Sequence, residues 1–279
     1  MDNRPIGFFD SGIGGLTCIP YILSDFPDEK IVYFGDTARI PYGSKSKSTI
    51  IKFAVEISDF LVEKHDVKML VIACNTISII AYDTLRQRYP NVQIVNITNS
   101  AVRSIVNTCT AENKIGIIAT KATIDSDAYK TRIQKQRPEL QVFGQSCPAF
   151  VPLIEENFQQ NPIMDMTIKY YLNDFLKDNK IDTLVLGCTH YPLVRDAIDR
   201  LYPGKRIIDP SKEMIRDIKE IFDSADLYSA DENPSHILYA SDLSENFVNM
   251  GNLVFSESDY QVTFIDFDLE NINKQKGVK

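Results

Sequence analysis

Several features that the 279-residue sequence lacks narrow its function. It has no apolar run of about 18 residues, so no membrane-spanning helix is predicted. Its start, Met-Asp-Asn-Arg-Pro, has no apolar core of a secretory signal. Its five cysteines are odd in number and show no CxxC spacing, which favours free thiols in a reducing cytoplasm over disulfides or a zinc site. We therefore expect a cytoplasmic protein without a membrane partner.

The sequence also has no excess of basic residues. Lys and Arg number 30 and Asp and Glu 38, which gives a formal net charge of -8. This balance argues against a protein whose main task is binding nucleic-acid phosphates, so no nucleic-acid partner is expected. Metal-ligand spacing and the lysine context of a pyridoxal site are missing as well, so neither a metal nor a cofactor is predicted.

What the sequence does contain is an alternation of short apolar runs with stretches of helical length. Runs such as "MLVIA" and "TLVLG" lack polar alternation, which is typical of strands buried on both faces. Alternating strands and helices predict an α/β protein whose mostly parallel sheets are flanked by helices. The expected strands are 5–9, 31–34, 69–73, 93–97, 115–119, 141–144, 183–187 and 206–208. The expected helices are 14–25, 47–64, 76–89, 99–111, 125–135, 163–178, 191–201 and 214–222.

Part of this pattern occurs twice. "LVIACNT" (70–76) aligns with "LVLGCTH" (184–190), which places Cys74 opposite Cys188. Downstream, "LRQRYPNVQIVNI" (85–97) aligns with "IDRLYPGKRIIDP" (198–210), and upstream "IGFFDS" (6–11) matches "IGIIAT" (115–120). A repeat of about 100 residues predicts two similar domains rather than a solenoid.

We expect these two domains to be pseudo-symmetric, with the active site in the crevice between them. The first domain is predicted to comprise residues 1–97 plus 208–279, and the second residues 98–207. The pattern "HILYAS…ENFVNMG…LVF" predicts a strand, a helix and a strand that return to complete the first domain. The final nine residues are polar and are expected to be frayed.

The two aligned cysteines follow strands and precede helices. In open parallel sheets ligands bind beyond the carboxyl ends of the strands, and a helix start stabilises a thiolate. The alternative is a small buried hydrophobic residue, because free cysteine is often inert. The paired occurrence favours chemistry: two acid/base groups on opposite walls of a crevice suit racemisation. Cys18, Cys109 and Cys147 lack such settings and are interpreted as structural.

The stretch "FFDSGIGGLT" (8–17) allows rival interpretations. A glycine-rich turn after a first strand, with Asp36 ending the second, is similar to a dinucleotide-binding fingerprint. However, Thr17 takes the third glycine position and Asp10 places a carboxylate where a pyrophosphate would bind. A phosphatase-like start would need a second aspartate where Gly12 stands. Asp10 is either a helix cap or a carboxylate that orients, or accepts a proton from, Cys74.

Four motifs in order, "FDSGIGGLT" (9–17), "GDTARIPYG" (35–43), "ACNT" (73–76) and "GCTHYP" (187–192), resemble those of glutamate racemases. "IGIIATKATIDSDAY" (115–129) and "CPAFVPLIEEN" (147–157) extend the resemblance over nearly the whole chain. It implies a cofactor-independent enzyme that interconverts L- and D-glutamate for bacterial peptidoglycan. It also leaves a homodimer possible.

The resemblance also implies roles for individual residues. Cys74 and Cys188 are implied as the two catalytic bases, with Asp10 assisting the first and His190 the second. Glu155 is implied to support the second side, and Asp36 to belong to the acid/base cluster. The implied substrate contacts are Asp10, Ser11, Tyr42, Gly43, Asn75, Thr76, Thr120, Thr123, Thr189 and His190.

Two stretches depart from the family pattern: "ACNTISII" is bulkier after Thr76, and "VNITNSA" (95–101) replaces a stretch richer in glycine and proline. Three alternatives remain open at this level. They are a related racemase or isomerase acting on another acidic substrate such as aspartate, a dinucleotide-dependent oxidoreductase, and a non-enzymatic regulator, since some family members inhibit DNA gyrase.

Overall fold

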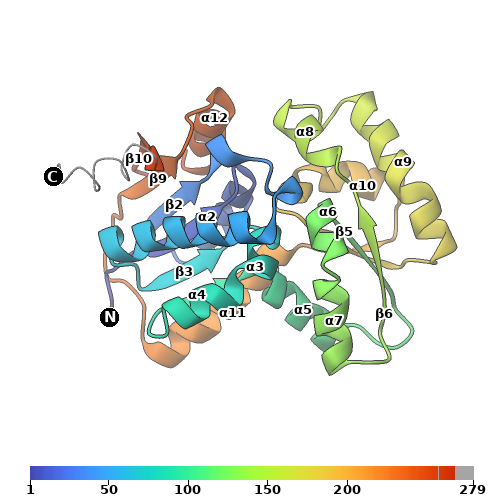
Figure 1. Ribbon diagram of the computed structural model, residues 1–279, viewed down its shortest axis with the longest axis horizontal. Helices are drawn as coiled ribbons and strands as arrows, with labels where there is room; N and C mark the ends of the chain where they lie inside the picture. The colour runs from blue at the N-terminus through green and yellow to red at the C-terminus, as the bar shows by residue number, and fades with distance from the viewer. Residues whose placement is uncertain (257, 268–279) are drawn as a thin grey trace.

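The computed structural model describes residues 1–256 and 258–267, so the predicted frayed tail lies outside the described residues. Two parallel sheets, each covered by helices on both faces, stand side by side (Figure 1). This confirms the predicted α/β class. We call the part built on the six-stranded sheet the large lobe and the part built on the four-stranded sheet the small lobe.

In the large lobe, all strand pairs run parallel. The sequence explains this arrangement, because its apolar runs supply side chains to both faces of each central strand. In spatial order the strands are β10 (Tyr260–Phe264), β9 (His236–Ala240), β2 (Ile31–Gly35), β1 (Ile6–Asp10), β3 (Met69–Ile72) and β4 (Gln93–Asn96).

Two apolar layers enclose this sheet. One face is covered by η1 (Gly14–Cys18), α1 (Ile19–Asp25), α11 (Pro210–Ala225) and α12 (Glu245–Val254). The other is covered by α2 (Lys47–Asp59), η4 (Phe60–Lys64), α3 (Asn75–Ile80) and α4 (Tyr82–Arg88). The short η2 (Thr37–Arg39) and η3 (Tyr42–Ser44) follow β2.

The small lobe repeats this plan around β6 (Gln141–Ser146), β5 (Lys114–Ala119), β7 (Thr183–Gly187) and β8 (Arg206–Ile208), in spatial order. Its pairs are also parallel. One face packs against α8 (Phe150–Glu155), α9 (Pro162–Asp178), η5 (Tyr191–Val194) and α10 (Arg195–Leu201). The other packs against α5 (Ile97–Thr108) and α7 (Ala128–Gln136), with α6 (Lys121–Asp125) preceding α7.

The eight expected strands up to residue 208 are confirmed, with ends within two residues of those predicted. Several expected helices are divided. The stretch 14–25 forms η1 and then α1, with Pro20 in the first turn of α1, where its missing N–H costs no hydrogen bond. The stretch 76–89 divides at Ala81 into α3 and α4. The predicted helix 125–135 contains the last residue of α6 and most of α7. The helix α8 was not predicted.

The strand predicted at "LVF" (253–255) is wrong. Leu253 and Val254 are the last residues of α12, and the strand that follows is β10. Phe247, Gly251 and Phe255 are buried at a spacing of four residues, which places them on one helical face. That periodicity, rather than the local apolar run, decides the structure. The strands β9 and β10 both join the large-lobe sheet.

The predicted domain division at residues 97 and 208 stays a prediction. The large-lobe sheet draws its strands from 6–96 and 236–264, and the small-lobe sheet from 114–208. Ile208 itself lies in β8, one residue past the predicted boundary.

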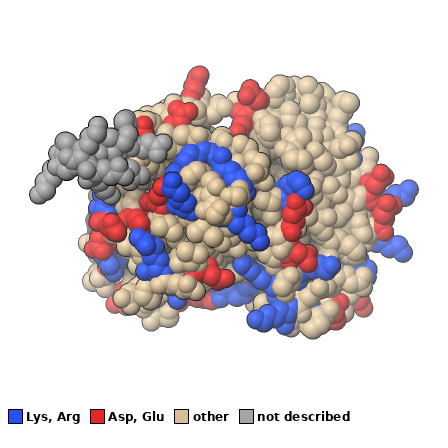
Figure 2. All heavy atoms as spheres, in the orientation of Figure 1, with Lys and Arg blue, Asp and Glu red and all other residues tan. Residues whose placement is uncertain are grey.

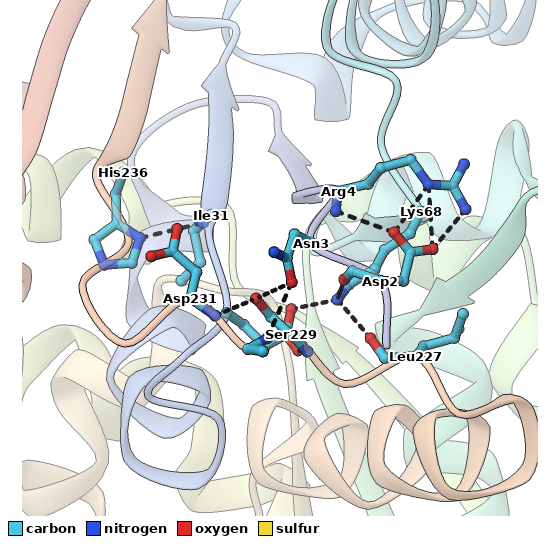
Figure 3. Close-up of polar contacts among 11 residues, drawn as sticks. Asp2, Asn3, Arg4, Ile31, Lys68, Leu227, Ser229, Asp231 and His236 are labelled. Atoms are coloured by element: carbon cyan, nitrogen blue, oxygen red, sulfur yellow. Dashed lines mark hydrogen bonds and ion pairs between the residues drawn. The ribbon is translucent and has the colours of Figure 1, made fainter.

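A buried ion pair lies at the amino-terminal end of the large-lobe sheet. Lys68 precedes β3, and its Nζ is 2.6 Å from Glu29 Oε2. The same ammonium group donates to the backbone carbonyls of Asp2 and Leu227, each at 2.6 Å (Figure 3). Glu29 in turn accepts a hydrogen bond from the backbone N–H of Ser229 at 2.7 Å. One charged pair thus joins the chain start, the sheet and the segment that leads to β9.

Among the described residues, no helix combines the length and apolarity needed to cross a membrane. Figure 2 shows groups of Lys and Arg separated by acidic and uncharged residues on the face seen.

Candidate functional site

Cys74 and Cys188 occupy matching positions in the two lobes. Cys74 lies two residues after the end of β3 and immediately before α3, and Cys188 directly follows β7. The strand β3 pairs with β1, and β7 pairs with β5. The two thiols are therefore held at the carboxyl ends of parallel strands, where such folds bind ligands. Both side chains are almost fully buried.

Both cysteines line one cavity of about 840 Å³, and its wall contains residues of the large and the small lobe. The structure thus brings together most of the predicted site. Predicted residues in its wall are Ser11, Tyr42, Gly43, Cys74, Asn75, Thr76, Thr120, Glu155, Cys188, Thr189 and His190. Asp10, Asp36 and Thr123 lie behind the wall, each in contact with a residue that forms it.

A chain of polar contacts leads away from Cys188. Its Sγ is 3.9 Å from His190 Nδ1, and His190 Nε2 is 3.0 Å from Glu155 Oε1. Burial disfavours the charged imidazole, but the contacts with Cys188 and Glu155 outweigh it and raise the pKa of His190 to about 10. His190 is therefore an imidazolium at neutral pH, and it lies beside the Cys188 sulfur.

The environment of Cys74 is different. Its Sγ contacts Ser11 Oγ at 3.5 Å. Burial and, secondarily, the charge of Asp10 raise the pKa of the Cys74 thiol to about 12. Asp10 is fully buried, accepts the Gly12 backbone N–H at 3.0 Å, and its own pKa is raised by burial. Cys74 is therefore held as a thiol in this state.

The glycine-rich turn of the large lobe packs directly on the Cys188 side. A Cβ at Gly14 would lie 2.4 Å from His190 Nδ1 and 2.4 Å from Thr189 Oγ1, so only glycine fits there. Thr17 Oγ1 reaches the backbone carbonyl of Thr189 at 2.9 Å, and Thr189 Oγ1 donates to Asp10 Oδ1 at 3.4 Å. The turn and its aspartate thus support the opposite lobe, and a pyrophosphate has no space at Gly14.

Three hydroxyl groups meet where α3 faces α6. Thr76 Oγ1 is 3.2 Å from Thr120 Oγ1 and 3.3 Å from Thr123 Oγ1, and Thr120 donates to Thr123 at 3.0 Å. Thr76 belongs to the large lobe and the other two to the small lobe. The cluster gives the cavity wall hydroxyl groups that can turn toward an anionic ligand.

Asp36 is fully buried beside the loop that carries Tyr42. Arg39 Nε donates to both of its carboxylate oxygens, at 2.8 and 2.7 Å, and Ser241 Oγ donates to it at 2.7 Å. The Tyr42 hydroxyl also donates to Asp36. The structure therefore places Asp36 behind Tyr42, and its membership of the acid/base cluster stays a prediction.

The other three cysteines are buried. Cys18 Sγ contacts Ser211 Oγ at 3.3 Å, and burial raises the pKa of Cys18 to about 12. Cys147 is fully buried yet borders the cavity, and burial also raises its pKa. Across residues 1–256 and 258–267, no group of three or more His, Cys, Asp or Glu side chains could hold a metal ion.

Sequence reasoning missed two residues that hold the site together. Tyr129 of α7 donates to Asn75 Oδ1 at 2.6 Å, and Asn246 of α12 donates to the backbone carbonyl of Glu155 at 2.7 Å. Both contacts join the two lobes. Tyr129 ends the "IDSDAY" stretch that extended the resemblance, whereas nothing near Asn246 distinguished it.

Known proteins resemble this chain in sequence. The sequence profile of the Asp/Glu/Hydantoin racemase family matches residues 19–218. The chain is 40% identical over 264 residues to the glutamate racemase of Neisseria meningitidis serogroup C, covering 94% of this chain and 97% of that protein. It is also 40% identical over 253 residues to that of Sulfurihydrogenibium sp., covering 91% and 94%.

Solved structures give the same result. The glutamate racemase of Francisella tularensis in complex with D-glutamate superposes with a TM-score of 0.89 at 38% identity, covering 96% of this chain and 100% of that one. An aspartate racemase of Picrophilus torridus reaches a TM-score of 0.55 at 13% identity, covering 80% and 94%, which shows a likeness of fold alone. The predicted resemblance is thereby confirmed, and the chain belongs to the Asp/Glu/Hydantoin racemase family.

Proposed function

We propose that this protein is a glutamate racemase that moves the α-proton with two cysteines and no cofactor, and that its D-glutamate serves peptidoglycan synthesis. One observation carries the mechanism: two buried cysteines, one from each lobe, line a single cavity. A two-base racemase needs a base on one face of Cα and an acid on the other. The proposed role in peptidoglycan synthesis rests on the family resemblance.

The two sides of the cavity suit opposite tasks. We propose that Cys188, which lies beside the His190 imidazolium, acts as the base, and that Cys74, held as a thiol, acts as the acid. The Cys188 sulfur takes the α-hydrogen as a proton and leaves the electron pair on the substrate. The Cys74 S–H bond then breaks and its proton forms the new Cα–H bond on the other face. After one turnover the two cysteines have exchanged protonation states, and the reverse reaction follows the same path.

Fixed hydrogen-bond donors stabilise the negative charge that develops on the substrate. Hydroxyl groups from Ser11, Thr76, Thr120 and Thr189, with the Asn75 amide, lie in the cavity wall. Such preorganised donors are most effective in a site that excludes water, because the local dielectric constant is low. We propose that they receive the two carboxylates of glutamate.

The alternatives are less well supported. Aspartate is disfavoured because the high-identity relatives are named for glutamate, whereas the aspartate racemase shares the fold alone. A dinucleotide is disfavoured because Asp10 occupies the Gly12 N–H and His190 occupies the space at Gly14. A homodimer and a regulatory role remain predictions.

The isotope content of the product tests the mechanism. In D₂O, L-glutamate incubated with the enzyme should give D-glutamate that carries deuterium at Cα, because the proton donor exchanges with solvent before substrate binds. The remaining L-glutamate should stay largely protonated, since the abstracted proton rests on the other sulfur. The measurement is mass spectrometry of the separated enantiomers at low conversion, repeated from D-glutamate.

Two results would count against the proposal. Product that retains the substrate hydrogen from both starting enantiomers would indicate one base that serves both faces. A circular dichroism signal that stays constant with glutamate but decays with aspartate would show that the protein acts on aspartate instead.

Replacing Gly14 by alanine should impair the reaction. The new methyl group would displace the His190 ring or separate the lobes, and overpacking of this kind costs about 1–3 kcal/mol. If that cost falls on the reacting geometry, kcat/KM drops by about tenfold to a hundredfold. Gly12→Ala is the control from the same turn, because its Cβ would meet only Ile40 Cγ2 at 3.4 Å. Equal activity of the two variants would show that the contact with His190 does not position the ring.

A further inference from the structure

The side chain of Asn75 is held from the opposite lobe. Asn75 is the first residue of α3, follows Cys74 directly and borders the cavity. Tyr129 lies on α7 of the small lobe, is itself buried, and donates its hydroxyl hydrogen to Asn75 Oδ1 at 2.6 Å. Tyr129 does not belong to the cavity wall, so Oδ1 is held by a residue that lies behind that wall.

The other end of the same carboxamide is unpaired. Asn75 Nδ2 is buried and has no acceptor among the described residues. A buried N–H group without an acceptor is unfavourable, and such groups are rare in folded proteins. With Oδ1 committed to Tyr129, Nδ2 is the polar atom of this side chain that remains for a ligand, and its residue borders the cavity. The missing acceptor fits a carboxylate oxygen of a bound substrate.

We propose that Tyr129 is a positioning residue for substrate binding, which fixes the Asn75 carboxamide so that its N–H₂ group, and not its oxygen, faces the substrate carboxylate. This inference rests on the proposed function, because it needs an anionic substrate in the cavity. A carboxamide can rotate by half a turn at little steric cost. In the rotated state Oδ1 would face the carboxylate and repel it.

The phenol of Tyr129 can favour only one orientation of the Asn75 carboxamide. Burial raises the pKa of Tyr129, so its hydroxyl keeps its proton and can donate. Because donor and acceptor come from different lobes, the orientation of Asn75 depends on the lobes being packed as they are here. Substrate affinity is thereby coupled to the contact between α3 and α7.

The test is Tyr129→Phe, which keeps the ring and removes only the hydroxyl. The expected result is a KM for L- and D-glutamate raised by about tenfold, with kcat changed by less than about threefold, because the lost contact binds ground state and transition state alike. Tyr202→Phe is a matched control: its hydroxyl donates to Asn173 Oδ1 at the same 2.6 Å, but at the surface. Its KM and kcat should equal those of the wild type.

A double-mutant cycle with Asn75→Ala separates positioning from folding. If Tyr129 acts through Asn75, Tyr129→Phe should raise KM in the wild type but not in the Asn75→Ala background. A KM of Tyr129→Phe within about twofold of the wild type, in a variant with a native circular dichroism spectrum, would overturn the inference. So would equal KM increases in both backgrounds. A wild type that does not racemise glutamate would refute the proposed function instead, which keeps the two failures distinct.

Discussion

Cys74→Ala and Cys188→Ala should each lower the racemisation rate by about a thousandfold or more, in both directions. Each direction uses one cysteine as the base and the other as the acid, so the loss of either group blocks both. The two variants should nevertheless differ in D₂O. Each variant keeps a base on only one face of Cα. Slow exchange of the α-hydrogen without racemisation is therefore expected for one enantiomer in each variant. The enantiomer that exchanges in one variant should be the opposite of the one that exchanges in the other. Circular dichroism and mass spectrometry measure the two effects.

The control for these variants is Cys109→Ala, which removes a buried thiol that does not border the cavity. Its racemisation rate should stay near that of the wild type. A Cys188→Ala protein with near-normal turnover would end the two-base proposal. Exchange of the same enantiomer by both variants would show that the cysteines stand on one face of the substrate.

Lys68→Met should lower the free energy of unfolding by about 3–5 kcal/mol, because it leaves the Glu29 carboxylate buried without its partner. The variant also loses both hydrogen bonds to the carbonyls of Asp2 and Leu227. The site at the opposite end of the sheet should be unaffected in the protein that remains folded. Urea unfolding followed by circular dichroism gives the comparison.

Lys121→Met provides the contrast, since Lys121 Nζ lies 2.6 Å from Asp125 Oδ2 with both side chains mostly exposed. An exposed pair at this helical spacing contributes about 0.3–0.5 kcal/mol. The double variant Lys68→Met with Glu29→Gln should recover part of the loss, because no buried charge is then left unpaired. Equal urea midpoints for Lys68→Met and Lys121→Met would show that the buried pair makes no special contribution.

The sequence by itself determined the alternation of strands and helices and the matching positions of Cys74 and Cys188. Buried parallel strands leave continuous apolar runs, and residues that follow such strands are placed at one edge of a sheet whatever the rest of the chain does. That is why the eight expected strands up to residue 208 appear in the structure. One ambiguous local pattern gave a wrong prediction. The run "LVF" is typical of a strand, but the spacing of the buried Phe247, Gly251 and Phe255 is helical, and Leu253 and Val254 end α12.

Only the tertiary structure decided which side chains meet across the lobes. Three contacts join residues that are far apart in the sequence. They are the packing of Gly14 against His190, the hydrogen bond from Asn246 to the Glu155 carbonyl, and the hydrogen bond from Tyr129 to Asn75. No local periodicity encodes such contacts, because they depend on how two separately covered sheets pack against each other. The same packing sets the protonation of the site: it places His190 between Cys188 and Glu155, and buries Cys74 near Asp10. The positions of the two thiols are therefore determined locally, whereas the different surroundings of each thiol are a property of the assembled fold.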